Sequence, residues 1–557
     1  MKEIFSDCSA VEKEAKRRFC FPEFVMMENA AAALEDAVLK ALERVCGERS
    51  RNGHPDAQDG TNDTVVVLCG SGNNGADGYA LSRRLFGVAD VAVAFLGEPK
   101  TAEAVAQRKM AASLGVPMTA DLAQAKELLQ DAAVIVDCLY GTGFHGGLGK
   151  EAAVLVRAAN EAAAYRIACD IPSGIDRNGI ICALEQALAT GSAVANGNNC
   201  AAGQPAAAGS AAERCGAGVS LAFCADETVT MGALKTALFS DAAKDFCGTI
   251  TTASLGIASA QFALCAVPDA FLLERADIRL PVRVKKSAHK GDFGHTAVVM
   301  GEKAGAAIVA GSAALSFGSG LVTEIDSGLC KTNFLMNPEL MIAKSLPERA
   351  SAVLLGSGLG RSEKSFAVIE NLVAKVCEMK NPSVVLDADF FYYENVTEVL
   401  ERLNSIPGAR VILTPHPKEL YELLRRTTLI APDTTLIEPV EITFDELCAH
   451  RFEYARRFAE KFSNLTLIAK GANTYIYSEG KVFVCDCGTP ALAKAGSGDV
   501  LAGLCAALLA QGYDAPNAAK TAVFAHAAAS LRFEESFACT PLALVEKCKE
   551  FAASAGI

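Results

Sequence analysis

The chain has 557 residues, enough for two to four domains that each bury a core of their own. Its formal net charge of −13 argues against nucleic acid or an anionic membrane surface as the main partner, so a bound phosphate must be held by a local site. The sequence has no long apolar run typical of a membrane span or a secretory signal, and its 20 Cys include no C-x-x-C pair, so we expect reduced thiols and a cytoplasmic protein.

Short apolar runs alternate with longer helical patterns along most of the chain, which is typical of βαβ units around a parallel sheet. We therefore predict an α/β fold in both halves. Strands of the first half are expected at residues 65–69, 91–95, 133–137 and 166–170, with helices between them. Residues 52–64 and an irregular insertion at about 187–218 are expected to be loops, because 191–218 is a run of Ala, Gly, Asn and Ser without a usable period.

A Gly-rich turn follows the first predicted strand, in the segment CGSGNNGADGYALSRRL. Gly70, Gly72, Gly75 and Gly78 allow a tight turn that brings backbone N–H groups close to a ligand just before a helix begins, as in a cradle for phosphate or ribose. The alternative is that glycine serves only the turn and that Asp77 only complements the helix dipole.

Two later strands of this half end in an acidic residue. Asp137 precedes a second Gly-rich loop, and Asp170 is followed by Ser173. Because ligands of open parallel sheets bind beyond the carboxyl ends of the strands, we expect these three side chains and Asn74 to converge. Their oxygen atoms suit a hard cation. Taken singly, each Asp fits a helix cap or a turn as well.

The motifs MMENAAA, NNGAD, GTGFHGG and DIPSGID make residues 10–257 resemble the NAD(P)H-hydrate epimerase domain. The resemblance implies a Rossmann-like three-layer αβα sandwich that interconverts the R and S forms of the C6 hydrate of NADH and NADPH. It also implies a catalytic Asp170 at the reacting ring, and a potassium ion bound by Asn74, Asp137 and Ser173. The residues implied to hold the hydrated nucleotide are Asn73, Asn74, Gly75, Ala76, Asp77, Gly141, Thr142, Gly143, Phe144, His145, Gly146 and Gly147.

The C6 atom of the hydrate carries an alcohol beside a ring nitrogen. Its configuration can invert by loss of the hydroxyl or by ring opening, and each route needs a positioned acid or base. Asp170 is the candidate, either as a proton donor or as the electrostatic partner of a transient iminium. The sequence leaves both roles open.

The domain boundary is expected near residue 270. The strand-like pattern fades over residues 249–280 before the basic segment KKSAHKGDFGH, which predicts domains at 1–265 and 270–557. The expected strands of the second half are at residues 297–300, 352–355, 383–386, 411–414, 465–470 and 474–477. A long Ala-rich helix should follow from Asp499.

The segment AKAGSGDVLAGLCAALLAQG places Gly496, Gly498 and Asp499 at the start of that apolar helix. Free N–H groups and the helix dipole favour an anion there, and a neighbouring carboxylate can take the proton of a hydroxyl that attacks a phosphoryl group. The alternative for Asp499 is a plain N-cap role. Upstream, the turn KGANT between two strands offers Lys470 to a nucleotide, and His416 lies between two prolines, where it serves either a ligand or the structure.

The motifs KGDFGHTAVVMG, AGAAIVAGSAAL, VVLDADFF, ILTPHPKEL, KGANT and AGSGD make residues 275–555 similar to the ADP-dependent NAD(P)H-hydrate dehydratases of the ribokinase-like superfamily. The resemblance implies a ribokinase-like αβα sandwich in which ADP phosphorylates the S hydrate, which then loses phosphate to give NAD(P)H and AMP. It implies Asp499 as the base, a Mg²⁺ ion without an identifiable protein ligand, and contacts of Ala306, Gly358, His416 and Asp499 with the hydrate. ADP, the co-substrate, would be bound by Lys470, Gly471, Ala472, Asn473, Thr474 and Gly498.

We expect small-molecule substrates as the partners, with no nucleic acid and no membrane, and a homo-oligomeric assembly. The alternative function is an ATP-dependent small-molecule kinase in the C-terminal half, joined to a non-catalytic ligand-binding module. Two departures from the epimerase pattern favour that module: Ala76 replaces a Gly, and LKTAL replaces a Lys-Pro-Gly segment.

Overall fold

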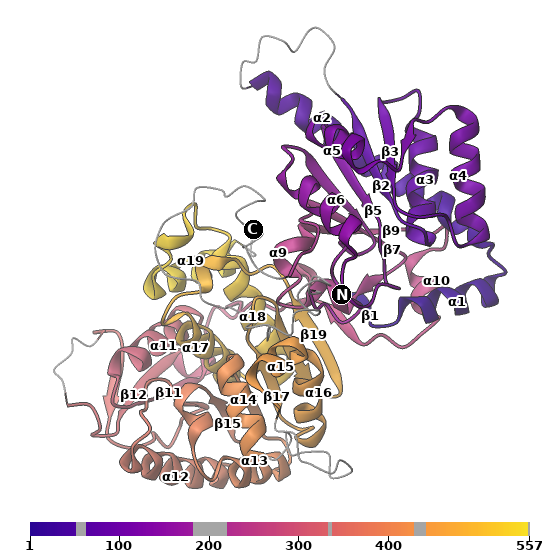
Figure 1. The fold of residues 1–557 in the computed structure, drawn as a ribbon. Coiled ribbons are helices and arrows are strands. Elements are labelled where there is room, and N and C mark those ends of the chain that lie inside the picture. The colour runs from indigo at the N-terminus through magenta and orange to yellow at the C-terminus, as the bar shows by residue number, and fades with distance from the viewer. Residues whose placement is uncertain (52–62, 182–219, 332–336, 428–441, 555–557) are drawn as a thin grey trace. The chain divides into compact units, whose positions relative to one another are not determined.

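The computed structural model describes residues 1–51, 63–181, 220–331, 337–427 and 442–554 (Figure 1). The chain divides into an N-terminal unit, Glu3–Asp269, and a C-terminal unit, Ala270–Ile557 with Met1–Lys2. The predicted insertion at 187–218 and most of the predicted loop at 52–64 lie outside the described residues. No helix in the described part of the chain is long and apolar enough to cross a membrane.

Among its described residues, the N-terminal unit has a seven-stranded sheet in the order β4-β3-β2-β5-β6-β7-β9, with every neighbouring pair parallel. The four predicted strands are present, each within one residue of its expected bounds. The strands are β2 (Val65–Cys69), β3 (Val91–Phe95), β4 (Met118–Thr119), β5 (Val134–Cys138), β6 (Tyr165–Cys169), β7 (Glu227–Met231) and β9 (Thr249–Ala253).

Helices cover both faces of this sheet (Figure 1). Alternate residues of β2 point to opposite faces: Val65 and Val67 join the core beneath α2 and α3, whereas Val66 and Leu68 join the core beneath α5 and α6. The predicted three-layer αβα sandwich is thereby confirmed. Its helices are α1 (Cys8–Phe19), α2 (Glu23–Arg51), α3 (Asn73–Leu85), α4 (Ala102–Leu114), α5 (Leu122–Gln130), α6 (Lys150–Glu161), α9 (Lys244–Cys247) and α10 (Ser259–Ala263).

The expectation that the strand pattern fades from residue 249 is wrong for β9, which pairs with β7 along its whole length. Most of β9, TITTA, is exposed or half-buried. An edge strand with a solvent-exposed face has no continuous apolar run, so apolar periodicity does not predict it. Another parallel pair, β1 (Lys2–Phe5) and β8 (Leu234–Lys235), aligns Phe5 with Lys235.

The C-terminal unit has strands in the order β13-β12-β11-β14-β15-β16-β17-β18-β19-β10. Neighbours from β13 to β17 are parallel, β17, β18 and β19 are antiparallel, and β10 runs parallel to β19. The six predicted strands are present, whereas β10, β12, β13 and β19 were not predicted. The strands are β10 (Ala270–Leu272), β11 (His295–Met300), β12 (Leu321–Asp326), β13 (Met341–Ala343), β14 (Ala352–Leu355), β15 (Ser383–Leu386), β16 (Arg410–Leu413), β17 (Thr466–Ala469), β18 (Thr474–Ser478) and β19 (Lys481–Cys485).

Helices also lie on both faces of this second sheet (Figure 1). Val298, Leu354 and Ile412 pack in one core with the Ala-rich helices α11, α17, α18 and α19, while α12, α13, α14 and α16 lie on the other face. The predicted three-layer αβα sandwich is thus confirmed for this unit as well. The helices are α11 (Ala304–Ser316), α12 (Glu363–Glu378), α13 (Val396–Ser405), α14 (Pro417–Arg426), α15 (Phe444–Ala449), α16 (Arg451–Lys461), α17 (Ser497–Ala510), α18 (Ala515–Ser530) and α19 (Pro541–Ala553).

Candidate active sites

The N-terminal unit has a cavity of about 760 Å³ beyond the carboxyl ends of β2, β5 and β6. This volume lies in the usual range for small-molecule sites. The predicted residues that line the cavity are Asn73, Asn74, Asp77, Gly141, Thr142, Gly143, Phe144, His145, Gly147 and Asp170. Gly75, Ala76 and Gly146 are not among the lining residues.

The Gly-rich turn after β2 is formed by close backbone contacts. A Cβ atom on Gly70 would lie 1.9 Å from the carbonyl oxygen of Leu139, and one on Gly75 would lie 1.9 Å from the carbonyl oxygen of Gly70. Ala76, in contrast, lies within α3, is fully buried and packs with Met27 and Ala104. Its φ angle is not positive, so alanine at this position carries none of the strain that a left-handed residue would have.

We expect Gly70→Ala to lower the free energy of unfolding of the N-terminal unit by about 1–3 kcal/mol, because the new methyl group overlaps the backbone of Leu139. Hydrogen exchange of the β2 and β5 amides measures this change in the full chain. Gly143→Ala is the matched control, since a Cβ atom there meets nothing within 4 Å. Equal protection in the two variants would contradict the close contact.

Asp170 directly follows β6 and has a positive φ of 74°, a conformation that is uncommon for residues other than Gly, Asn and Asp. Its Oδ1 lies 2.6 Å from Nζ of Lys235 and accepts a hydrogen bond of 3.1 Å from the N–H of Met231. Its Oδ2 accepts a long hydrogen bond of 3.4 Å from the N–H of Thr142, in the second Gly-rich loop. The carboxylate therefore joins a buried cation on one side to the cavity wall on the other.

Three further carboxyl groups, those of Glu12, Glu23 and Asp77, line the same cavity. Asp77 is only 9% exposed, and its Oδ1 is buried without a hydrogen-bond partner. Burial, together with the charge of Asp170, raises the pKa of Asp77 well above its usual value. Burial also raises the pKa of Glu12 to about 7, although Lys235 lowers it.

The three residues predicted to bind a cation are linked by hydrogen bonds. Asn74 donates to the carbonyl oxygen of Tyr140, whose N–H donates to Oγ of Ser173, and that hydroxyl donates to Asp137. Asp137 is fully buried, and the partners of its carboxylate are neutral: Ser173 and the N–H of Leu139. Burial raises the pKa of Asp137 to about 6. Asp137 and Ser173 thus lie beneath the cavity wall rather than in it.

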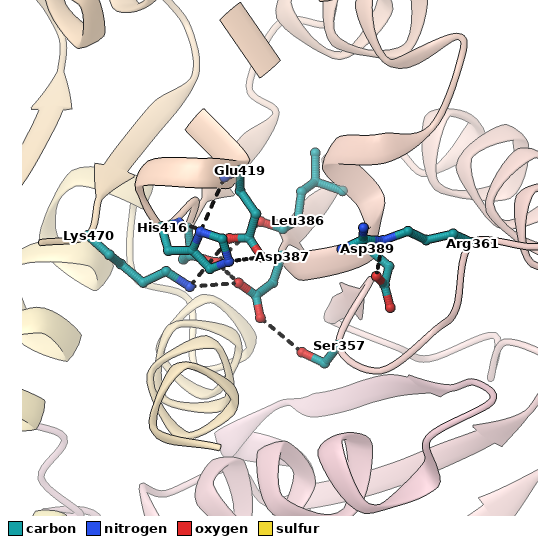
Figure 2. Close-up of polar contacts among 9 residues, drawn as sticks. Ser357, Arg361, Leu386, Asp387, Asp389, His416, Glu419 and Lys470 are labelled. Atoms are coloured by element: carbon teal, nitrogen blue, oxygen red, sulfur yellow. Dashed lines mark hydrogen bonds and ion pairs between the residues drawn. The ribbon is translucent and has the colours of Figure 1, made fainter. Parts of the chain in front are cut away.

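The site of the C-terminal unit is centred on Asp387, which directly follows β15 and is 2% exposed (Figure 2). One carboxylate oxygen accepts from the hydroxyl of Thr414 at 2.6 Å and from Nζ of Lys470 at 3.2 Å. The other accepts from Oγ of Ser357 at 3.1 Å. Asp387 therefore fixes side chains from three segments that follow different strands.

Lys470 and His416 meet around Glu419, in the first turn of α14 (Figure 2). Nε2 of His416 lies 3.1 Å from one oxygen of Glu419, and Nζ of Lys470 lies 3.9 Å from the other. Burial, and then the charge of Lys470, lower the pKa of His416 to about 4, so its ring is neutral at pH 7. Because the imidazole remains 46% exposed, it can still contact a ligand.

The helix α17 begins beside this cluster. Gly496, its N-cap residue, has a φ of 90°, and a Cβ atom on Gly498 would lie 3.2 Å from Nζ of Lys470. Asp499 lies in the first turn and is half-buried. Burial and the neighbouring Asp387 raise its pKa to about 6, while a hydrogen bond from Ser357 lowers it. The charge of Lys470 and the free N–H groups of α17 therefore lie close to a carboxylate that is ionised at neutral pH.

The remaining predicted residues lie on two turns. In the KGANT turn, Gly471 and Ala472 are exposed, Thr474 is half-buried, and Asn473 is 2% exposed. Arg451 of α16 holds this turn by donating to the carbonyl oxygens of Ala469, Lys470 and Asn473. Ala306 and Gly358 face each other, since a Cβ atom on Gly358 would lie 2.8 Å from Cβ of Ala306. Ser357, which contacts Asp387, joins this pair to the cluster.

Several residues of these sites were not predicted from the sequence, among them Lys235, Asp387, Glu419 and Arg451. Asp387 could have been found by the rule applied to Asp137 and Asp170, because it too is an acid directly after a buried strand. Lys235 and Arg451 carry no such signal, since their partners include residues of other segments. In the described part of the chain, no group of three or more His, Cys, Asp or Glu is arranged to hold a metal ion.

Two families match the chain. Residues 296–550 match the family described as NAD(P)H-hydrate dehydratase, and residues 23–237 match the family described as YjeF-related protein N-terminus. A bifunctional NAD(P)H-hydrate repair enzyme of Helicobacter pylori is 36% identical over 551 residues, which cover 99% of this chain and 100% of the relative. The Coxiella burnetii enzyme of the same name is 32% identical, over 86% of this chain and 87% of the relative.

Solved structures also match part of the chain. The ADP/ATP-dependent NAD(P)H-hydrate dehydratase from Bacillus subtilis, co-crystallised with ATP and Mg²⁺, covers 52% of this chain and 99% of its own, with 23% identity and a TM-score of 0.40.

Proposed function

Because the chain belongs to the family of bifunctional NAD(P)H-hydrate repair enzymes, we propose that it repairs hydrated NADH and NADPH in two steps. The N-terminal domain, residues 1–265, interconverts the R and S hydrates. The C-terminal domain, residues 270–557, dehydrates the S hydrate at the expense of ADP and gives NAD(P)H, AMP and phosphate. The presence of one acidic site in each unit, at the carboxyl ends of parallel strands, is the observation that supports this division best.

In the N-terminal domain, the hydrated ring lies in the cavity beside Asp170. Loss of the hydroxyl leaves a cation on the ring, and a fixed carboxylate stabilises such a charge as it develops. Ring opening instead needs a base for the hydroxyl proton, and the same carboxylate can serve. Asn73, Asn74, Asp77 and the loop 141–147 hold the nucleotide around it.

In the C-terminal domain, Asp499 takes the proton of the hydrate's hydroxyl as that oxygen attacks the terminal phosphoryl group of ADP. The new O–P bond forms as the bond to AMP breaks, and phosphate then leaves as the C6–O bond breaks and a ring proton is lost. The start of α17 and Lys470 stabilise the charge of the moving phosphoryl group. Ala306, Gly358 and His416 contact the hydrate, and the KGANT turn contacts the nucleotide.

Potassium suits the N-terminal site, because Asn74, Asp137 and Ser173 offer oxygen atoms in one connected set, and the buried carboxylate of Asp137 has only neutral hydrogen-bond partners. A bound cation would supply the charge that keeps this carboxylate ionised. Mg²⁺ fits the C-terminal site only as a companion of the nucleotide. There the ammonium group of Lys470 already supplies a positive charge to Asp387, Glu419 and Asp499. Mg²⁺ would neutralise phosphate charge.

The alternative of an ATP-dependent small-molecule kinase with a non-catalytic N-terminal module is not favoured by the family assignment. The structure also removes one argument for it, because Ala76 is unstrained in α3. The cytoplasmic location, the homo-oligomeric state and the lack of nucleic-acid and membrane partners stay predictions.

Incubation with mixed hydrate epimers and ADP tests the proposed function. Chromatography should show both epimers consumed, with AMP and NAD(P)H formed in equal amounts, and without ADP the epimers should only equilibrate. Replacing potassium salts by tetramethylammonium salts should slow epimerisation and spare dehydration. Consumption of ATP with an unrelated hydroxylated metabolite, and none of the hydrates, would favour the kinase alternative.

A further inference from the structure

Lys235 is a buried cation that no part of the proposed mechanism uses. It lies in β8, in the LKTAL segment, and it is 2% exposed. The parallel pairing of β8 with β1 aligns it with Phe5 and fixes its backbone. Taking an ammonium group out of water is costly unless it is paired and hydrogen-bonded, so its partners must compensate for its position.

The contacts of Lys235 Nζ meet that requirement. The ammonium donates to Oγ1 of Thr230 and to the carbonyl oxygen of Met231, each at 2.9 Å, and to the carbonyl oxygen of Ala233 at 3.3 Å. Its ionic partner is Asp170 at 2.6 Å. Thr230 and Met231 also donate to the same oxygen of Asp170, at 3.5 and 3.1 Å. The cation and the carboxylate are therefore held in one orientation by shared neighbours.

Several acidic groups compete for this single cation. The groups that face it are Asp170 after β6, Glu12 and Cys8 on α1, and, through Asp170, Asp77 on α3. Among the residues that the structure describes, Asp170 alone makes an ion pair with it. Asp77 and Glu12, on the same cavity, have pKa values raised by burial. Asp170 is therefore the carboxylate paired with a cation, whereas Asp77 and Glu12 hold a proton more readily. Such a difference allows neighbouring acids to take different roles in one site.

We infer that Lys235 is a positioning residue for epimerisation, which fixes the charge and orientation of Asp170 so that Asp77 is left as the neutral acid of the cavity. This inference rests on the proposed function of the N-terminal domain. In the hydroxyl-loss route, the proton of Asp77 leaves with the hydroxyl oxygen as water when the C6–O bond breaks, and the ring cation lies beside the Asp170 carboxylate. Water then adds to the other face, the C6–O bond forms again, and the proton returns to Asp77.

The test compares conversion of the R to the S hydrate by the full-length wild type, Lys235→Gln and Lys235→Arg across pH 4.5–9. Removing the cation leaves the buried carboxylate of Asp170 without its ionic partner, which disfavours its charged form. We expect Lys235→Gln to reduce kcat by about 10-fold or more, because the carboxylate is no longer oriented. The loss of its activity at low pH, the acid limb of the profile, should begin at a higher pH than in the wild type, with KM within about threefold of wild type. Lys235→Arg should restore the acid limb.

Lys109→Gln is the matched control, because Lys109 is exposed on α4 and does not line the cavity. Should Lys235→Gln fail to fold, Thr230→Val decides the question. It removes the hydroxyl that joins Lys235 to Asp170 and keeps both charges, so kcat should fall by about threefold or more, with a smaller acid-limb shift in the same direction.

The inference would be overturned if the wild type is active and Lys235→Gln or Thr230→Val folds with the kcat and the acid limb of the wild type. That result would leave the proposed function standing. A folded wild type that does not interconvert the hydrates would overturn the proposed function, and this inference with it.

Discussion

The substitution Asp499→Asn should reduce ADP-dependent dehydration of the S hydrate by roughly 10²-fold or more, as expected when a general base is lost. Epimerisation should stay at the wild-type rate, because Asp170 and its cavity belong to the other unit. The alternative of a plain N-cap role for Asp499 is wrong, because the N-cap of α17 is Gly496. Asparagine keeps the size of the side chain but cannot act as the base, so the substitution tests the catalytic role.

The pH profile of dehydration gives a second measure of the same group. Because the pKa of Asp499 is raised to about 6, its carboxylate is protonated as the pH falls through that value, and a protonated base cannot accept the substrate proton. Dehydration by the wild type should thus fall below about pH 6, and the residual activity of Asp499→Asn should lack this limb. The measurement is kcat/KM for the S hydrate with saturating ADP.

Asp514→Asn is a matched control, since Asp514 is the N-cap of the next helix, α18, where it accepts from the N–H of Asn517. This variant should dehydrate the S hydrate at the wild-type rate. Equal loss of dehydration and epimerisation in Asp499→Asn would refute the division of labour between the two units.

Apolar periodicity and turn residues predicted most interior strands of the two sheets, although not β7 and β12. Strands such as β14 and β15 are fully buried apolar runs, and their bounds agree with the predicted ones. The edge strand β9 was missed because its Thr side chains lie partly in water. The hairpin strand β19 was missed too, although most of it is buried, since its signal depends on pairing with β18. An apolar run in the sequence predicts a buried strand. A strand that depends on its pairing with a neighbouring strand is harder to predict from sequence.

The same distinction applies to the sites. Asn74, Asp137, Asp170 and Ser173 were predicted from one rule. The structure links Asn74, Asp137 and Ser173 by hydrogen bonds through Tyr140, and Asp170 lines the cavity together with Asn74. No pattern in the sequence predicts a role for Lys235, whose segment LKTAL differs from the Lys-Pro-Gly segment of the family. Its role depends on β8 pairing with β1 and on the positive φ of Asp170, and neither is visible in sequence.

Lys470 was predicted to contact the nucleotide from the KGANT turn, and the structure adds what else it contacts. Its ammonium group is 3.2 Å from Asp387, and Glu419 and Asp499 also act on its charge. Burial lowers the pKa of Lys470, but these carboxylates outweigh burial and raise it. The cation therefore balances an acidic cluster at the start of α17, where the phosphates of ADP must approach.

The substitution Lys470→Ala should weaken the binding of ADP by roughly 10²-fold and that of the S hydrate by much less. It leaves the carboxylates of Asp387, Glu419 and Asp499 without their cation, and like charges then oppose the anionic phosphates by several kcal/mol at this range, of the order seen for buried charge pairs that lose one partner. Calorimetry with each ligand alone measures the two affinities. Lys364→Ala, on the exposed face of α12, changes the net charge equally and should leave both affinities within about threefold.

The order of the two losses identifies the site. A larger loss for the hydrate than for ADP would show that Lys470 faces the ring and that the two ligands are assigned backwards. Equal losses would indicate collapse of the cluster, which thermal unfolding of the variant would reveal, because Asp387 is 2% exposed and its remaining partners, Ser357 and Thr414, carry no charge. Asp387→Asn in the Lys470→Ala background should then recover part of the lost stability, because it removes the buried charge that the first substitution left unpaired.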